Sequence, residues 1–237
     1  MRRGPADPRS LPRRAQLSPA CEQPAQAPPR RLQRRSRHHP VDPEVAAICA
    51  AAAAKLASAG VDVEEAHPTC RTPTMPFSLA GRSLRRLAWR PAARVSASAE
   101  AGDGLNIEKG LKLGAAEHLE AEAQRAEMVE RTVAFFETFD LLLAPATIVA
   151  PFPVEHRYVE SCAGHKFETY IDWLAIAYAI TLTTAPALSM PCGFTASGLP
   201  VGLQVVARPR AEHDLLAHAA FIEGVLDAAI TTPIDPR

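Results

Sequence analysis

Apolar and polar positions alternate with a helical period in three parts of the chain. Between residues 115 and 139, apolar side chains recur three and four positions apart, with acids and arginines between them. This spacing predicts a long amphipathic helix. Its expected inward-facing residues are Leu119, Ala123, Ala126, Val129, Val133 and Phe136. Residues 167–184 are largely apolar and predict a second, mostly buried helix, and residues 212–229 predict a closing amphipathic helix.

Short, almost continuously apolar runs predict strands. Residues 187–191 and 200–207 form two such runs, and Thr195–Gly198 supplies a turn between them. Residues 141–143 form another run, which Pro145 closes. A strand that is covered on both faces need not alternate apolar and polar side chains, so these runs are typical of buried strands.

A capped helix is predicted at the start of the ordered part of the chain. Asp42 can accept hydrogen bonds as the N-cap, and Pro43 suits the first helical position. An alanine-rich run then leads to Gly60, which favours a helix end, and residues 61–65 suggest a short strand. The order helix, glycine, strand is typical of an α/β fold, and we expect a mixed β-sheet flanked by helices.

Charge is distributed unevenly along a chain of zero net charge. Residues 1–40 carry a net charge of +8 and few large apolar residues, so we expect a disordered Arg/Pro-rich arm there. Residues 66–99 carry six arginines and no acid, and the irregular segment is expected to run to residue 104. Its abrupt change in composition resembles translation in a different reading frame. Residues 41–237 are expected to form the folded domain.

The five cysteines are scattered, and none forms a CxxC pair. An odd number of cysteines in a chain of this length is typical of reduced thiols and favours a cytoplasmic location. Cys192 is expected to be a small buried thiol, and His213 and His218 are expected to be solvated. No motif indicates a cofactor or a metal site. The longest apolar runs are far shorter than the ~20 residues that cross a bilayer, so no membrane association is expected.

Four blocks carry a family resemblance, and their specific part is PCGF, then GLPVGLQ, then RP followed by a helix. The blocks are residues 41–68, 106–147, 152–194 and 198–223. In this order they resemble the C-terminal part of the amidase signature family. That family hydrolyses carboxamide C–N bonds, and the resemblance implies a mechanism with two serines and a lysine acting on a small-molecule amide.

The residues that perform this chemistry are not found in the chain. In the family they lie in the N-terminal half, in a loop rich in glycine and serine, because backbone amides must approach the developing oxyanion closely. Only four widely separated glycines precede Asp103. The four lysines all fall inside blocks that resemble the non-catalytic half. We therefore expect no catalytic residue, an incomplete amidase-signature fold from a truncated chain, and no activity of the chain alone.

Candidate substrate contacts come from the third block. The resemblance implies that its helical region shapes the substrate pocket, and the side chains that suit this role are Glu168, Tyr170, Asp172 and Trp173. Aromatic rings can line an apolar pocket, and a carboxylate can orient a polar group of the substrate. The alternative is that Tyr170 and Trp173 only pack their helix into the core.

Three alternatives remain open at this point. The chain can be a fragment similar to the A subunit of a glutamyl-tRNA amidotransferase, which works with partner subunits. It can also be a non-catalytic binding module that uses the arm of residues 1–40 on nucleic acid, although no aromatic residue is interleaved there to stack on bases. Finally, it can complete its sheet with another chain or as a homo-oligomer, because an incomplete sheet has unpaired edges.

Overall fold

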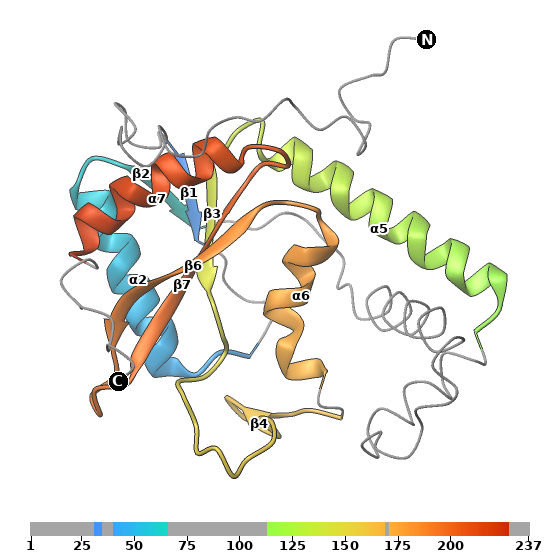
Figure 1. The fold of residues 1–237 in the computed structure, drawn as a ribbon, viewed down its shortest axis with the longest axis horizontal. Coiled ribbons are helices and arrows are strands. Elements are labelled where there is room, and N and C mark those ends of the chain that lie inside the picture. The colour runs from blue at the N-terminus through green and yellow to red at the C-terminus, as the bar shows by residue number, and fades with distance from the viewer. Residues whose placement is uncertain (1–30, 35–39, 66–112, 169–170, 228–237) are drawn as a thin grey trace, which may run out of the picture.

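A computed structural model describes residues 31–34, 40–65, 113–168 and 171–227. Their centre is a five-stranded mixed sheet of order β2-β1-β3-β7-β6 (Figure 1). Its strands are β1 (Arg31–Arg34), β2 (Asp62–Glu65), β3 (Leu141–Pro145), β6 (Ala187–Phe194) and β7 (Pro200–Ala207). A two-stranded hairpin consists of β4 (Ser161–Cys162) and β5 (His165–Lys166). The helices are α2 (Pro43–Ser58), α5 (Ala115–Phe135), α6 (Ala175–Leu182) and α7 (Glu212–Leu226). The α/β prediction is confirmed.

Strand β1 corrects the predicted end of the N-terminal arm. Arg31–Arg34 pairs in parallel with both β2 and β3, so the arm expected to reach residue 40 does not include these four residues. The composition argument failed here because strand formation depends on backbone hydrogen bonds to neighbours that lie far away in sequence. Residues 1–30, and the irregular segment predicted at 66–104, lie outside the described residues.

Apolar residues fill both sides of the central strands. Helices α2 and α7 share one core with β3 and β7, in which Leu141, Leu143 and Leu203 are almost fully buried. Leu142 points to the opposite face, where it packs with Ile180 of α6. Strand β3 is thus covered on both sides, which confirms the interpretation of its continuous apolar run.

Helix α2 begins and ends as its sequence predicts. The Asp42 carboxylate accepts a hydrogen bond from the Glu44 amide at 2.8 Å, and Pro43 occupies the first turn. Gly60 follows the helix with a φ of +90°, a conformation that glycine adopts without strain. The Asp42 cap and Gly60 therefore define where α2 begins and ends.

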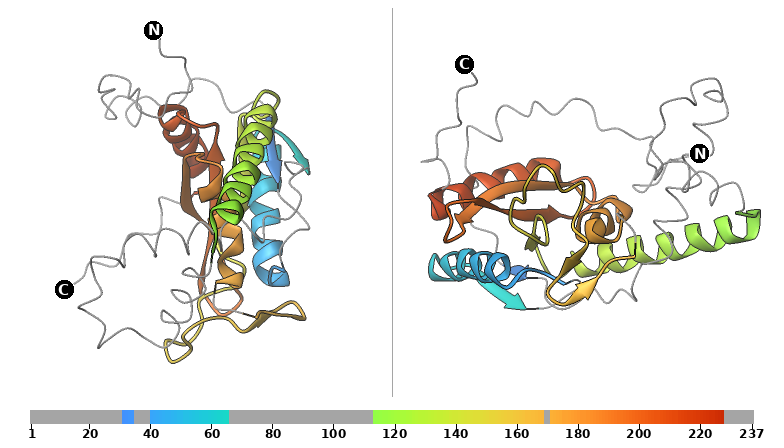
Figure 2. Two further views of the ribbon diagram at one scale, coloured as in Figure 1. Left: turned by 90° about the vertical axis from the view of Figure 1, so that its right-hand side faces the viewer. Right: turned by 90° about the horizontal axis from the view of Figure 1, so that it is seen from below.

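The predicted apolar face of α5 is wrong. The buried residues of this helix are Ala121, Met128 and Thr132, whereas Leu119 and Val133 are 69% and 47% exposed. Helix α5 projects beyond the sheet (Figures 1 and 2), so among the described residues only part of its length has a neighbour to pack against. Apolar residues spread around much of this alanine-rich helix, and the contact with α6 selects a different stripe from the one expected.

The second predicted helix is shorter than expected. Instead of one helix over residues 167–184, a 3₁₀ turn (Asp172–Leu174) leads into α6. Phe167 still belongs to the β4–β5 hairpin, because its amide donates to the Glu160 carbonyl at 2.9 Å. The closing helix α7 forms as predicted and buries Leu215 and Ile222.

The β6–β7 hairpin confirms the two predicted strands and extends the first of them to Phe194. In the turn, the Thr195 hydroxyl accepts a hydrogen bond from the Leu199 amide at 2.9 Å, and Gly198 has a φ of +83°. The ladder is irregular between Pro191 and Gly193. Strand β6 lies at the edge of the sheet, where a proline and a bulge are tolerated.

Candidate functional site

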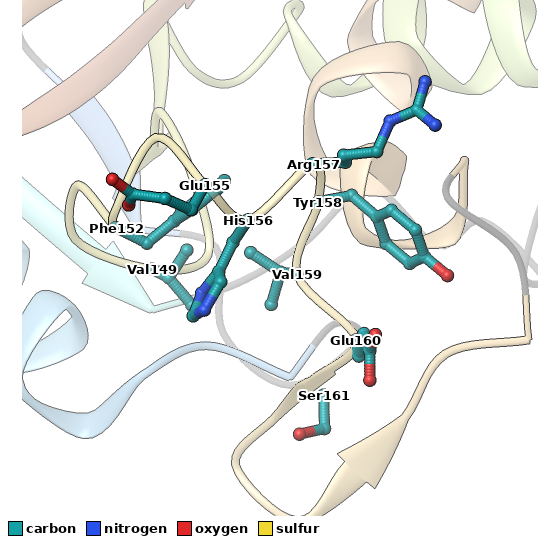
Figure 3. A pocket seen from close by; sticks show the side chains of 9 residues that line it. All are labelled: Val149, Phe152, Glu155, His156, Arg157, Tyr158, Val159, Glu160 and Ser161. Carbon is teal, nitrogen blue, oxygen red and sulfur yellow. The ribbon is translucent and has the colours of Figure 1, made fainter. Parts of the chain in front are cut away.

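A cavity of about 590 Å³ lies in the loop that joins β3 to the β4–β5 hairpin. Among the described residues, a single stretch of chain supplies the lining (Figure 3). The lining residues are Val149, Phe152, Glu155, His156, Arg157, Tyr158, Val159, Glu160 and Ser161. Its volume lies in the range of small-molecule sites.

The loop is anchored at Ile148. The carbonyl oxygen of this residue accepts a hydrogen bond from the Asp42 amide at 2.8 Å and one from the Cys162 thiol at 3.5 Å. One carbonyl thus connects the end of β3, the start of α2 and the hairpin. The first residues of the cavity loop are therefore held by the main fold.

A satellite apolar cluster packs against two residues of the cavity wall, Val149 and Val159. It consists of Ile148, Cys162, Phe167 and Ile176, with Trp173 and Val159 packed against it. Burial raises the pKa of the Cys162 thiol, and the nearby Asp42 carboxylate raises it further. Cys162 is thus held in its neutral form, which suits a structural thiol rather than a nucleophile.

Trp173 connects the predicted substrate residues with the cavity. Its ring packs edge-to-face on Phe152, a lining residue, with ring centroids 5.9 Å apart. The side chain of Glu168 is exposed and does not line the cavity. Tyr170 lies outside the described residues. Of the predicted set, Trp173 is the one whose contact with the cavity wall is described.

Asp172 is placed at a different contact. It begins the 3₁₀ turn, and its carboxylate lies close enough to Tyr178 to influence that phenol. Burial is the main cause that raises the pKa of Tyr178, and the negative charge of Asp172 adds to it. Tyr178 packs with Met128 and Leu182, at the contact of α5 with α6. Asp172 is therefore associated with this helix contact.

The cavity wall combines both signs of charge with an apolar side. Glu155 and Glu160 are acidic, Arg157 is basic, and Phe152 and Val149 are apolar. In Figure 3 the imidazole of His156 and the guanidinium of Arg157 point in opposite directions from the loop. Such a wall can hold a small molecule that has a polar group and an apolar part.

The sequence has a feature that indicates a binding loop here, and it was not among the predicted site residues. Residues 155–158 form a run of charged and aromatic side chains, and Pro151 and Pro153 precede it. Prolines prevent the run from joining a helix or an interior strand, so its polar side chains must lie on a connection. Polar groups on a connection that a rigid scaffold holds are a usual source of binding sites.

A second, smaller cavity of about 250 Å³ lies between the end of α5, the end of β7 and the start of α7. Its lining includes Asp140, Arg208, Asp214 and His218. The Nδ1 atom of His218 is buried and has no hydrogen-bond partner among the described residues. Burial lowers the pKa of His218, although the carboxylates of Asp140 and Asp214 oppose this effect. His218 is thus half-buried, and the prediction of a solvated histidine is wrong.

The described ranges show neither a metal cluster nor a membrane span. Within them, no group of three or more His, Cys, Asp or Glu side chains is arranged to hold a metal ion. None of the helices there combines the length and the apolar character that a bilayer crossing requires.

The sequence model of the family described as Amidase matches residues 32–216. The chain belongs to the amidase family. The match runs through the sheet, the satellite cluster and the cavity loop, and it ends within α7. The resemblance drawn from PCGF and GLPVGLQ is confirmed.

Curated relatives of this amidase-family chain include an acylamidase and several amidotransferase A subunits. An acylamidase of Rhodococcus erythropolis is 30% identical over 206 residues, which are 82% of this chain and 42% of the relative. The A subunit of the glutamyl-tRNA(Gln) amidotransferase from Moorella thermoacetica is 40% identical over 88 residues, which are 37% of this chain and 17% of the relative. The chain spans less than half the length of these relatives.

Solved structures of amidase-family enzymes share the fold. A 6-aminohexanoate cyclic dimer hydrolase superposes with a TM-score of 0.80 at 20% identity, over 98% of this chain and 52% of that one. A bacterial aryl acylamidase superposes with a TM-score of 0.77 at 19% identity, over 95% of this chain and 50% of that one. The chain corresponds to about half of each solved structure.

Proposed function

We propose that the chain is the C-terminal scaffold of an enzyme that hydrolyses a small-molecule carboxamide, and that the cavity loop forms one wall of its substrate site. The observation that carries the proposal is the family match, because it runs continuously through the cavity loop. The cavity supports it through its volume and its mixed polar and apolar wall.

Amide hydrolysis requires a nucleophile, a base and donors for the oxyanion. In the family, two serines and a lysine perform this chemistry from a glycine- and serine-rich half. This sequence shows no glycine- and serine-rich loop of that kind, and the chain spans about half of its solved relatives. The chain by itself therefore provides the scaffold and part of the substrate site, and it does not hydrolyse amides alone.

We propose that the cavity loop and the predicted substrate residues Glu168, Tyr170, Asp172 and Trp173 select the substrate. Phe152 presents an apolar surface, and Trp173 fixes its orientation through the edge-to-face contact. Glu168, Tyr170 and Asp172 remain proposed contacts, which would act in the presence of the missing half. A substrate with an aromatic or alkyl acyl group would match the Phe152 side of the wall.

A chimeric enzyme tests this proposal. The matching C-terminal part of the Rhodococcus acylamidase would be replaced by residues 32–237 of this chain. We expect the chimera to hydrolyse an acyl amide and Trp173→Ala to raise its KM, because Phe152 loses its support. Trp173→Phe, which keeps an aromatic ring, serves as the matched control. A chimera that unfolds cooperatively but hydrolyses no amide would contradict the proposal.

A second candidate function is that of the A subunit of a glutamyl-tRNA amidotransferase. Identity to two such proteins supports it, namely 31% over 133 residues for Myxococcus xanthus and 40% over 88 residues for Moorella thermoacetica. This function predicts stable complexes with partner subunits and ammonia release from glutamine. Co-purification of the tagged chain from its own cells separates the two candidates, since a free-standing amidase needs no such partners.

The reduced thiols and the sheet edges support two further proposals. The described cysteines Cys49, Cys162 and Cys192 form no disulfide, which favours a cytoplasmic location. Strands β2 and β6 lie at the two edges of the sheet, so a partner chain or a second copy can extend it. Size-exclusion chromatography with light scattering would show whether the purified chain is a monomer.

A further inference from the structure

Two cysteines from distant parts of the sequence meet in the main core. Cys49 lies in α2 and Cys192 lies in β6, and 143 positions separate them along the chain. Their sulfur atoms are 3.9 Å apart. The amidase chemistry proposed above uses neither of these side chains.

Close packing of α2 on the β6–β7 hairpin produces this contact. Cys49 belongs to the buried stripe of α2, between Val45 and Ala52. The packing beside it is close, because a Cβ atom on Gly193 would lie only 2.7 Å from a methyl group of Ile48. The helix and the edge strand are therefore held at a short and well-defined separation.

The bulge in β6 sets the position of Cys192. In the ladder Pro191 faces Gly202 and Gly193 faces Val201, and Cys192 has no opposite residue. The Cys192 thiol instead donates to the Val201 carbonyl at 3.4 Å, and the Cys49 thiol lies 3.9 Å from the Gly202 carbonyl. Both sulfur atoms thus lie against the backbone of two consecutive residues of β7.

The two thiols differ in their access to solvent and in acidity. Cys49 is 4% exposed, whereas Cys192 is half-buried. The hydrogen bond from Cys49 lowers the pKa of Cys192, although burial opposes it. A thiol that is partly exposed and more acidic reacts first with an incoming disulfide, and its buried neighbour is placed to resolve the product.

We propose that Cys49 and Cys192 are a redox modification site, at which exchange with a small disulfide such as oxidised glutathione forms an internal disulfide. The Cys192 thiolate attacks the reagent, forms a mixed disulfide and releases one thiolate. Cys49 loses its proton and attacks the sulfur of Cys192, and the second thiolate leaves. The two cysteines lose two protons and two electrons, and the reagent is reduced to two thiols.

The geometry requires only a small movement. The sulfur atoms must close from 3.9 Å to the disulfide bond length of about 2.0 Å. The bond would attach α2 to the edge strand and would close a long loop of chain. Closing a long loop restricts the unfolded ensemble and therefore stabilises the fold.

The test uses the full reduced chain, incubated with oxidised glutathione under native conditions. We expect peptide mapping to find the Cys49 and Cys192 peptides joined, with the loss of two hydrogen atoms and no retained glutathione. The thermal midpoint should rise by about 5 °C or more, and dithiothreitol should reverse the change. Cys162 should stay unmodified at short times, because it is buried and its pKa is raised.

Matched variants separate the two steps of the exchange. Cys49→Ser should retain one glutathione on Cys192, because the resolving thiol is missing. Cys162→Ser should behave as the unaltered chain does. The proposal is overturned if Cys49 or Cys192 instead joins Cys21 or Cys70, if the unaltered chain keeps glutathione on Cys192 without closing the bridge, or if both thiols remain unreacted.

Discussion

At the scale of single residues, the fold disfavours the protonated form of His218. Its Nδ1 atom is buried without a hydrogen-bond partner in the described part of the chain, and burial lowers its pKa below the ordinary value of 6.5. The carboxylates of Asp140 and Asp214 in the same cavity reduce this effect without cancelling it. The folded state therefore resists protonation of His218 more than the unfolded state does.

This difference predicts a pH-dependent stability. The unfolded state binds the proton of His218 more tightly than the folded state does. Neutral His218 therefore makes its full contribution to the free energy of unfolding above pH 6.5. This contribution is lost as pH falls through the lower pKa that His218 has in the folded state. We expect the free energy of unfolding to fall between about pH 7 and pH 5, and to fall less in His218→Gln. Urea titrations across this range measure it. His213→Gln is the matched control, because His213 is exposed on the same helix. Equal pH slopes in both variants and the unaltered chain would count against the assignment.

Two glycines should respond in opposite directions to the same substitution. A Cβ at Gly193 would meet Ile48 at 2.7 Å, whereas a Cβ at Gly224 in α7 meets nothing within 4 Å. Gly193→Ala should destabilise the fold by about 1–3 kcal/mol through overpacking. Gly224→Ala should stabilise it by up to about 1 kcal/mol, because alanine favours the helix. Chemical unfolding of both variants compares them directly, and a neutral Gly193→Ala would mean that α2 packs more loosely on β6.

At the scale of elements, the start of α2 connects the main fold with the cavity loop. The side chain of Asp42 caps the helix, and its backbone amide donates to Ile148 at 2.8 Å. The Ile148 carbonyl also accepts from Cys162, which belongs to the hairpin. Local stability of the cavity loop therefore depends on where α2 begins.

Removing the cap should have a limited and predictable cost. Asp42→Ala should lower the free energy of unfolding by about 1 kcal/mol, because the Glu44 amide loses its acceptor. Asp42→Asn keeps an acceptor oxygen and should stay within a few tenths of a kcal/mol of the unaltered chain. Guanidinium unfolding monitored by circular dichroism distinguishes the two variants. An equal loss in both variants would show that the negative charge of Asp42, rather than its acceptor oxygen, is decisive, because both variants lack the charge.

The elements also show what the sequence can predict. Strands β3 and β7 were predictable because their apolar runs reflect burial, which depends little on register. The buried face of α5 was not predictable, because its alanines make several stripes of the helix equally apolar. The contact with α6 determines which of these stripes is buried. Strand β1 was missed because its ladder depends on β2 and β3, which lie far from it in sequence.

The candidate site was only partly predictable, for a related reason. The family resemblance indicated the region around Trp173, and the structure places that ring against Phe152 of the cavity wall. The wall itself comes from the connection after β3, whose shape is set by anchors at Asp42 and Cys162. No local pattern in the sequence encodes such anchors, so the loop could be predicted as irregular but not as a cavity.

At the scale of the whole molecule, a well-packed sheet stands beside helix α5, whose described packing lies chiefly at its contact with α6. The core between α2, α7 and the sheet contains almost fully buried side chains such as Leu56, Val205 and Ile222. Helix α5, in contrast, projects beyond the sheet and leaves Leu119 largely exposed (Figure 2). The chain spans about half of the solved amidase-family structures that it matches. We infer that it provides the scaffold of an amidase while catalysis depends on residues outside it.

Amide hydrolysis by the purified 237-residue chain tests this inference most directly. The chain would be incubated with a simple anilide, with and without prior heating, and the released amine would be measured. We predict no release above the uncatalysed rate at any protein concentration. Release that increases in proportion to the protein and disappears on heating would contradict the inference, because the chain would then contain its own catalytic residues.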